Sequence, residues 1–338
     1  MNTAMWFKAL RVIPQIDQEE WKSLDIISKW MIASRSAVLV ITFISAAIAG
    51  ILAIRQEKFD IVLWLIVTFG LLMAHATNNL VNDITDSWKG VDKGDDAFRS
   101  QYGPQPIEHG LLTTRQMLVY AAITGLIALA AGIYLVYARG GYTLLLLGLG
   151  VFFALLYTWP LKHIGLGEVA VLLVWGPLMI GGGYYVITGE WSWEVTLAGL
   201  PYALGATTVI FGKHIDKLKM DKKRGLHTLP VILGDRNSRY VAIAMMVLQY
   251  VMVVTLVIAG FFTLVMLLVV AAIGKFRIAL KVFREPKPEK PPEEYPEEGW
   301  PLWYVAFAFL HNRTYGFYFL VALLIDTLLP PLFNIVAG

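Results

Sequence analysis

Apolar stretches of about twenty residues recur along the chain from Ser34 onward. A stretch of that length crosses the hydrocarbon core of a bilayer as one α-helix. Lipid admits only helices and closed barrels, because it offers no partners to exposed backbone polar groups. The strict alternation of barrel strands is absent here, and only 16% of the 338 residues are charged. The sequence therefore predicts an all-α polytopic membrane protein.

We predict nine transmembrane helices in one domain at residues 31–338, preceded by a cytoplasmic segment at 1–30. The spans are expected at about 31–54, 60–82, 115–137, 142–159, 167–188, 194–213, 239–259, 261–283 and 303–330. The longer loops are expected at about 83–114, 214–238 and 284–302. The last of these is rich in Pro and Glu, which indicates an extended surface loop without assigned chemistry.

The distribution of basic residues orients the predicted bundle. With the N-terminus in the cytoplasm, and with flanking helix ends counted, only Arg55, Lys58 and Arg139 of the 28 Lys and Arg lie outside. This asymmetry satisfies the positive-inside rule. It predicts an integral protein of the cell (inner) membrane whose long loops, and any site they carry, face the cytoplasm.

Composition excludes several other classes of function. The net charge of +3 is too small to indicate a nucleic-acid partner, and the absence of cysteine excludes thiolate chemistry. The first thirty positions contain Asp17, Glu19, Glu20 and Asp25 and no apolar core before a small-residue cleavage site, which argues against a signal peptide. Trp6, Phe7 and Leu10 are compatible with a short interfacial helix, and an ordinary cytoplasmic tail is equally compatible.

One stretch, NNLVNDITDSWKGVD, places clustered oxygen ligands where the second apolar run ends. Asn79, Asp83 and Asp86 are spaced i, i+4 and i+7, so they form one stripe on a helix. Asn82 lies beside the stripe and Asp92 follows it. Acids at a membrane helix end favour a divalent-cation site. The alternative is a polar cap where the helix leaves lipid.

A second acidic pair, Asp216 and Asp221, follows the sixth predicted span among many bases. Taken alone, this pair is explained by a basic loop with acids that balance its charge. Two sets of acids on one face of the membrane, however, suit the binding of a diphosphate, because carboxylates hold Mg²⁺ and bases neutralise the remaining negative charge of the phosphates. The five-residue spacing separates the two acids by about 140° on an ideal helix. Either the helix is interrupted between them, or only one is a ligand. The recurrence of acids four spans apart hints at a duplicated unit.

Three stretches, taken together, resemble the UbiA-type intramembrane prenyltransferases, most closely the 1,4-dihydroxy-2-naphthoate polyprenyltransferase branch of menaquinone biosynthesis. They are Asn82-Asp83-Ile84-Thr85-Asp86 with Lys89-Gly90-Val91-Asp92; Tyr157-Thr158-Trp159-Pro160-Leu161-Lys162 with Gly165-Leu166-Gly167-Glu168; and Gly225, Thr228-Leu229-Pro230 and Leu233-Gly234. The second acidic motif departs from the family pattern, because Lys217 stands where the first Asp is usual.

The resemblance implies a nine-helix UbiA-type bundle with two cytoplasmic Asp-rich motifs. It implies Mg²⁺-dependent transfer of a polyprenyl group from polyprenyl diphosphate to an aromatic acceptor, with membrane lipid around the isoprenoid tail. The implied metal ligands are Asp83, Asp86, Asp92, Asp216 and Asp221. The implied substrate contacts are Asn79, Asn82, Arg99, Lys162, Lys222 and Arg35. The implied catalytic groups are Asp83, Asp86, Lys162 and the π face of Tyr157.

Each of these assignments has a plainer alternative. Single bases in cytoplasmic loops are commonly solvated, Arg35 has the position of a snorkelling residue, and a lone Tyr157 is typical of an interfacial belt. Other acceptors remain open: 4-hydroxybenzoate, homogentisate, a tetrapyrrole or a lipid alcohol. A cation-coupled transporter is the alternative from another class, although transporter acids are usually near mid-membrane.

Overall fold

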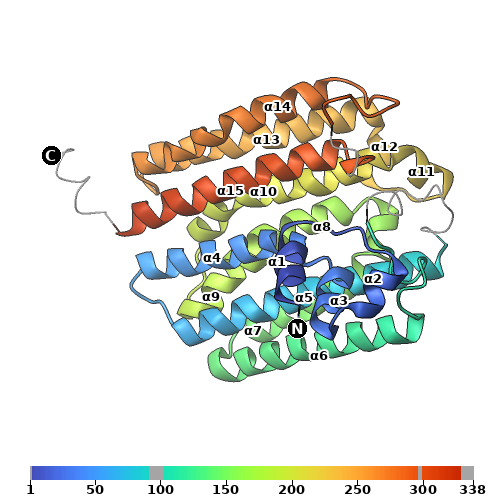
Figure 1. The fold of residues 1–338 in the computed structure, drawn as a ribbon. Helices are drawn as coiled ribbons and strands as arrows, with labels where there is room; N and C mark the ends of the chain where they lie inside the picture. Colours follow the sequence, from blue (N-terminus) through green and yellow to red (C-terminus); the bar gives the residue numbers. More distant parts are fainter. Residues whose placement is uncertain (1, 91–102, 296–298, 329–338) are drawn as a thin grey trace.

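A computed structural model describes residues 2–90, 103–295 and 299–328 of the chain. All regular secondary structure in these ranges is helical (Figure 1). The α-helices are α1 (Thr3–Arg11), α2 (Gln18–Ser23), α3 (Ile26–Ala33), α4 (Val40–Arg55), α5 (Ile61–Trp88), α6 (Thr114–Arg139), α7 (Thr143–Leu156), α8 (Gly167–Leu173), α9 (Gly183–Thr188), α10 (Trp193–Asp216), α11 (Leu218–Lys223), α12 (Leu229–Leu233), α13 (Asp235–Ile258), α14 (Ile273–Arg284) and α15 (Tyr304–Leu328). The 3₁₀ segments are η1 (Ser36–Val38), η2 (Leu161–Ile164) and η4 (Leu264–Ala272), and η3 (Val174–Gly182) is π-helical.

Six helical stretches in the described part of the chain are long and apolar enough to cross a membrane. They are Ser36–Arg55, Ile61–Trp88, Thr114–Arg139, Gly167–Thr188, Trp193–Asp216 and Asp235–Ile258. The remaining three predicted spans correspond to the shorter α7, to η4 with α14, and to α15. The all-helical class is confirmed, whereas nine transmembrane helices stay a prediction.

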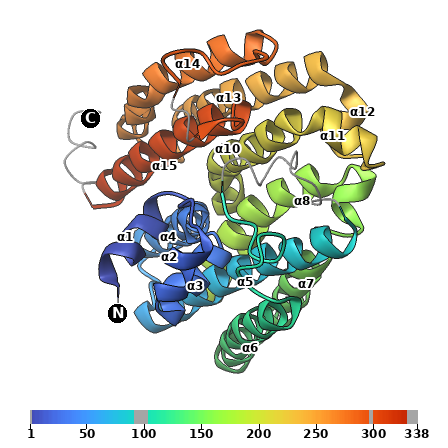
Figure 2. The ribbon, with the colours of Figure 1, turned by 45° about the vertical axis from the view of Figure 1, so that its right-hand side comes forward.

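Helix α10 lies in the interior of the bundle and organises its largest apolar core. It packs against α15, α13, η3 and α8, and its apolar side chains join those of α4 and η4 in one buried cluster. A second layer is formed by α5 and α6, with α7 packed against both (Figure 2). Figure 1 shows the end of α5 and the short helix α11 at the same end of the bundle, at the right of the view.

The N-terminal helices α1 to α3 pack on the flank of α5 and α6 rather than standing apart. Met5 and Ala9 of α1, Trp21 of α2 and Met31 of α3 share a buried cluster with Leu80 of α5. This arrangement places the chain just before α4 beside the polar end of α5. The N-terminal segment therefore contributes to the surroundings of the predicted site.

The start of α15 is held against the end of α10 by a close backbone approach. A Cβ atom on Gly212 would lie 2.8 Å from the carbonyl carbon of Tyr304 and from the amide nitrogen of Val305. One turn later, the Asp216 carboxylate accepts hydrogen bonds from the first amide groups of α15 and the residue before it. The donors are the N–H groups of Trp303 (3.0 Å), Tyr304 (3.2 Å) and Val305 (3.1 Å).

The loop before α15 is anchored at both ends. Lys287 Nζ lies 3.3 Å from Asp216 Oδ1, and the Lys287 ammonium also covers the Trp300 ring at 4.8 Å. The Tyr295 ring packs against Trp303 with a centroid distance of 5.3 Å. Residues 289–294 between these anchors are exposed, as the sequence predicts. The ends of the loop pack against the bundle through their aromatic and charged side chains.

Gly212→Ala is expected to lower the free energy of unfolding by about 1–3 kcal/mol, because the added methyl group collides with backbone that cannot rotate away. The measurement is the thermal unfolding midpoint of purified protein in detergent. Gly148→Ala is the matched control, since a methyl group added at Gly148 would meet no neighbouring atom within 4 Å. Equal midpoints for both variants would contradict the close approach.

Asp216→Ala is expected to lower the free energy of unfolding by about 3 kcal/mol, because it leaves α15 uncapped and Lys287 without its buried carboxylate. Asp216→Asn is expected to lie between this variant and the wild type, since the amide keeps one acceptor oxygen. Thermal midpoints and turnover are measured together. An unchanged midpoint with abolished turnover would contradict the capping role.

Candidate functional site

The polar end of α5 is buried inside the protein. The apolar run and the cap at Asp60, whose carboxylate accepts the N–H groups of Val62 and Leu63, start a helix that continues unbroken to Trp88. Asn79, Asn82, Asp83 and Asp86 are each at most 8% exposed. Because the helix does not break, the predicted stripe exists. Burial of two carboxylates requires nearby positive charge.

Arg35 supplies that charge to Asp83. It precedes η1 with a left-handed backbone, φ 57°, a strained conformation for a residue with a Cβ atom. Its guanidinium donates to Asp83 Oδ1 at 3.0 Å and to the Asn79 carbonyl at 2.9 Å. Asn79 Nδ2 in turn donates to the Ser34 carbonyl at 2.9 Å. The predicted Arg35 therefore lies inside the cluster, not at the lipid interface.

Lys162 pairs with Asp86. Its ammonium lies 2.8 and 2.9 Å from the two carboxylate oxygens, and both side chains are buried. Asn82 Nδ2 donates to Asp86 Oδ2 at 3.2 Å. The backbone N–H of Lys162 donates to the Tyr157 carbonyl at 2.9 Å. The motif that contains Tyr157 and Lys162 thus meets the α5 motif directly.

The second acidic motif meets the same cluster through Asp221 and two lysines. Asp221 is 1% exposed, and its Oδ1 lies 3.6 Å from Lys217 Nζ. Lys213 and Lys217 interact electrostatically with Asp86. These two lysines are part of the cluster that the sequence interpretation missed. Their i, i+4 spacing, which places them on one helical face at the end of α10, was the available signal.

Asp216 has structural partners that the sequence interpretation does not predict. The sequence interpretation makes it a metal ligand, but both of its oxygens accept N–H groups at the start of α15. Helix α10 ends at Asp216 and α11 begins at Leu218, so the chain is interrupted between the two acids. Asp216 shares the Gly212 face, which packs on α15, whereas Asp221 lies beside Lys217 in the cluster. A metal-ligand role for Asp216 stays a prediction.

Tyr157 lies among these charges. It is half-buried and interacts electrostatically with Glu168, Asp86 and Asp221. Burial and nearby carboxylates both disfavour the negatively charged form of a phenol. A neutral phenol ring can attract a cation to its π face.

A buried acid–imidazole pair adjoins Tyr157. Glu168 Oε1 lies 2.5 Å from His214 Nδ1, and both residues are at most 2% exposed. Glu168 Oε2 accepts the N–H of Leu229 at 3.4 Å. The pair joins the start of α8 to α10 and α12. Glu168 follows from the sequence motif, whereas its partner His214 is assigned only by the fold.

The structure does not connect the remaining predicted contacts to this cluster. Lys222 is exposed on α11. Asp92 and Arg99 lie outside the described residues. Their predicted roles stay predictions.

The donor set fits Mg²⁺ through few protein ligands. Among the residues that the structure describes, no three His, Asp or Glu side chains form a ready-made metal cage. Mg²⁺ is commonly bound by one or two carboxylates together with substrate phosphates and water. Asp83 and Asp86 lie within one turn on α5, and Asn82, whose Nδ2 donates to Asp86 Oδ2, adds an amide oxygen to the donor set. These oxygen donors fit a Mg²⁺ ion that a substrate phosphate would help to hold.

The chain is similar to known proteins of one family. The UbiA prenyltransferase family matches residues 42–305. The 1,4-dihydroxy-2-naphthoate octaprenyltransferase of Escherichia coli (strain K12) is 30% identical over 223 residues, which cover 62% of this chain and 70% of that protein. The enzyme of the same name from Bacillus subtilis (strain 168) is 26% identical over 231 residues, covering 67% of this chain and 73% of that protein.

Solved structures share the fold at lower identity. A UbiA homolog from Archaeoglobus fulgidus bound to DMAPP and Mg²⁺ aligns with a TM-score of 0.58 at 14% identity, covering 87% of this chain and 99% of that chain. A UbiA homolog from Aeropyrum pernix K1 aligns with a TM-score of 0.59 at 17% identity, covering 85% and 98%. The family match, the shared fold and the six apolar helices lead to one conclusion: the chain belongs to the UbiA prenyltransferase family and is an integral membrane prenyltransferase.

Proposed function

We propose that this protein transfers a polyprenyl group from polyprenyl diphosphate to 1,4-dihydroxy-2-naphthoate, as in menaquinone biosynthesis, and that the reaction depends on Mg²⁺. The convergence of the α5 carboxylates with the cations of three other segments carries the proposal. Relatives named as 1,4-dihydroxy-2-naphthoate octaprenyltransferases support the acceptor. Fold neighbours bound to DMAPP or GPP with Mg²⁺ support the diphosphate and the metal.

The charges of the cluster match a metal–diphosphate ligand. Three acids, Asp83, Asp86 and Asp221, are gathered with Arg35, Lys162, Lys213 and Lys217. Cations and carboxylates in such a dry site interact strongly with charge that develops during a reaction. A diphosphate brings negative charge that the four cations neutralise, while the carboxylates retain partners. A polar helix cap alone would not need four buried or half-buried cations.

Asp83 and Asp86 are the proposed metal holders, with Asn82 and Asp221 as supporting oxygen donors. Bound Mg²⁺ supplies positive charge that stabilises the diphosphate as a leaving group. Lys162 and Arg35 are held by the same carboxylates at 2.8–3.0 Å, and this supports a role for both cations in contacting the diphosphate oxygens. Pre-positioned cations lower the barrier because they need little reorganisation as the C–O bond breaks.

Loss of the diphosphate leaves an allylic cation on the prenyl group. The neutral Tyr157 ring offers it a π face, and a ring carbon of the acceptor then forms the new C–C bond. Glu168, held by His214, is the proposed partner of an acceptor hydroxyl and takes up the proton that the substituted ring releases. The positive-inside distribution of Lys and Arg supports a site on the cytoplasmic face of the cell membrane.

Asp83→Asn and Asp86→Asn are each expected to lower kcat by at least about 100-fold, because each removes a charge on which the leaving-group site depends. Turnover is measured with purified protein in detergent, and thermal midpoints establish that the variants fold. Glu190→Gln is the control, since it removes an acid from the exposed Lys58–Glu190 pair. Near-normal turnover of both Asp variants would contradict the proposed metal site.

Offered labelled geranylgeranyl diphosphate and a panel of acceptors, the protein is expected to prenylate 1,4-dihydroxy-2-naphthoate most efficiently. EDTA is expected to abolish product formation and added Mg²⁺ to restore it. Chromatography of labelled products is the measurement. Preference for 4-hydroxybenzoate, homogentisate, a tetrapyrrole or a lipid alcohol would replace the proposed acceptor. Ion flux in liposomes without product from any acceptor would contradict the enzyme assignment.

A further inference from the structure

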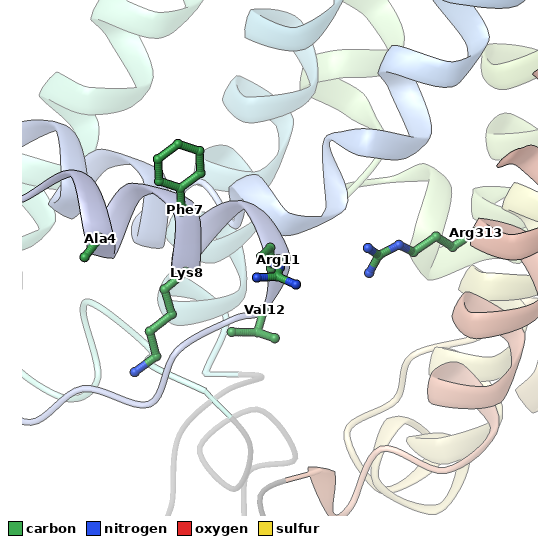
Figure 3. Close-up of a pocket in the computed structure, with 6 residues that line it drawn as sticks. All are labelled: Ala4, Phe7, Lys8, Arg11, Val12 and Arg313. Atoms are coloured by element: carbon green, nitrogen blue, oxygen red, sulfur yellow. The ribbon is translucent and has the colours of Figure 1, made fainter.

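A cationic cavity lies away from the acidic cluster, between α1 and α15. It has a volume of about 540 Å³ and is lined by Ala4, Phe7, Lys8, Arg11, Val12 and Arg313. Figure 3 shows Arg313 reaching from its helix toward Arg11 on the facing side. The lining holds three cations and no acid. Like charges placed together across a cavity repel, so the arrangement favours an anion between them.

Helix α1 is fixed so that it presents these cations. The backbone N–H of Asn2 donates to Asp25 Oδ2 at 2.8 Å, and Trp6 Nε1 donates to Asp25 Oδ1 at 3.2 Å. Met5 and Ala9 are buried against the N-terminal cluster. Lys8 and Arg11 lie outside this buried side and are exposed. Within the described part of the chain, no ion pair connects either residue to an acid.

Arg313 is placed unusually for a solvated arginine. It lies nine residues after the start of α15, which corresponds to about 14 Å of helix. Leu310 and Phe317, at i−3 and i+4, share its face and are 40% and 60% exposed. An exposed arginine between apolar side chains on a helix of a membrane protein requires water or an anion for its charge.

We propose that Lys8, Arg11 and Arg313 bind the phosphate-bearing headgroup of an anionic membrane phospholipid. Lysine and arginine both recognise phosphate, and two guanidinium groups match its oxygens. The apolar flanks favour a lipid over free phosphate. Phe7 is 68% exposed beside the cations, and Leu310 and Phe317 continue an apolar surface along α15 for the acyl chains. The bound lipid joins the amphipathic α1 to α15 through its headgroup.

Native mass spectrometry of the full-length protein tests this site, with dioleoyl phosphatidylglycerol and dioleoyl phosphatidylcholine titrated separately. The wild type is expected to bind phosphatidylglycerol more tightly than phosphatidylcholine. The double variant Arg11→Gln/Arg313→Gln is expected to bind phosphatidylglycerol about 30-fold more weakly, with unchanged phosphatidylcholine binding. Lys8→Gln is expected to give a smaller loss. Thermal midpoints in detergent identify variants that fold.

Arg277→Gln is the matched control, because Arg277 is an exposed arginine on α14, outside the cavity. It is expected to keep wild-type lipid binding. An equal loss in this control would show general surface attraction and overturn the site. Unchanged binding by the folded double variant would also overturn it. Competition by inorganic phosphate at millimolar concentration would show a site for free phosphate, and would overturn the lipid assignment.

Discussion

Burial of charge at the ends of two apolar helices is the constraint on which the rest of this structure depends. Asp83 and Asp86 are 6% and 5% exposed, at a point where α5 leaves an apolar run. A buried carboxylate is tolerated only with a cation and hydrogen bonds beside it. The chain supplies Arg35 from the segment before α4 and Lys162 from the segment after α7. Three segments of the chain are thereby joined at the acidic end of α5.

Two neighbouring faces of the end of α10 contact different parts of the protein. Gly212 and Asp216, four residues apart, pack on the start of α15. Lys213 and Lys217, shifted by one residue, interact with Asp86. One residue of shift corresponds to about 100° of rotation, so adjacent positions serve separate partners. The scaffold and the proposed reaction site are consequently built from interleaved residues of the same turns, and a substitution in either set must be measured for both stability and turnover.

Much of the site could be predicted from the chain alone. The stripe on α5, the Tyr157–Lys162 segment and the acid at Asp221 follow from helical spacing and from resemblance to the UbiA family. Asp216 could not be assigned, because a carboxylate near a helix end suits a metal and a cap equally well. The spacing of Lys213 and Lys217 predicts one shared helical face, but partners could not be assigned to them or to His214. Their roles depend on which helices face α10, and spacing within one helix does not contain that information.

The sequence by itself determined the class of the protein: an all-helical membrane chain with acid motifs at helix ends and a family resemblance that the match over residues 42–305 confirms. The lengths of the apolar stretches and the composition are sufficient to assign this class, because a backbone in lipid must satisfy its own hydrogen bonds and therefore forms helices or closed barrels. Only the tertiary structure decided which charges are partners. Arg35 with Asp83, Lys162 with Asp86, and Asp216 with the N–H of Tyr304 join residues 48, 76 and 88 positions apart. Such pairings arise from the packing of whole helices, which fixes the distances between charges that local sequence leaves free.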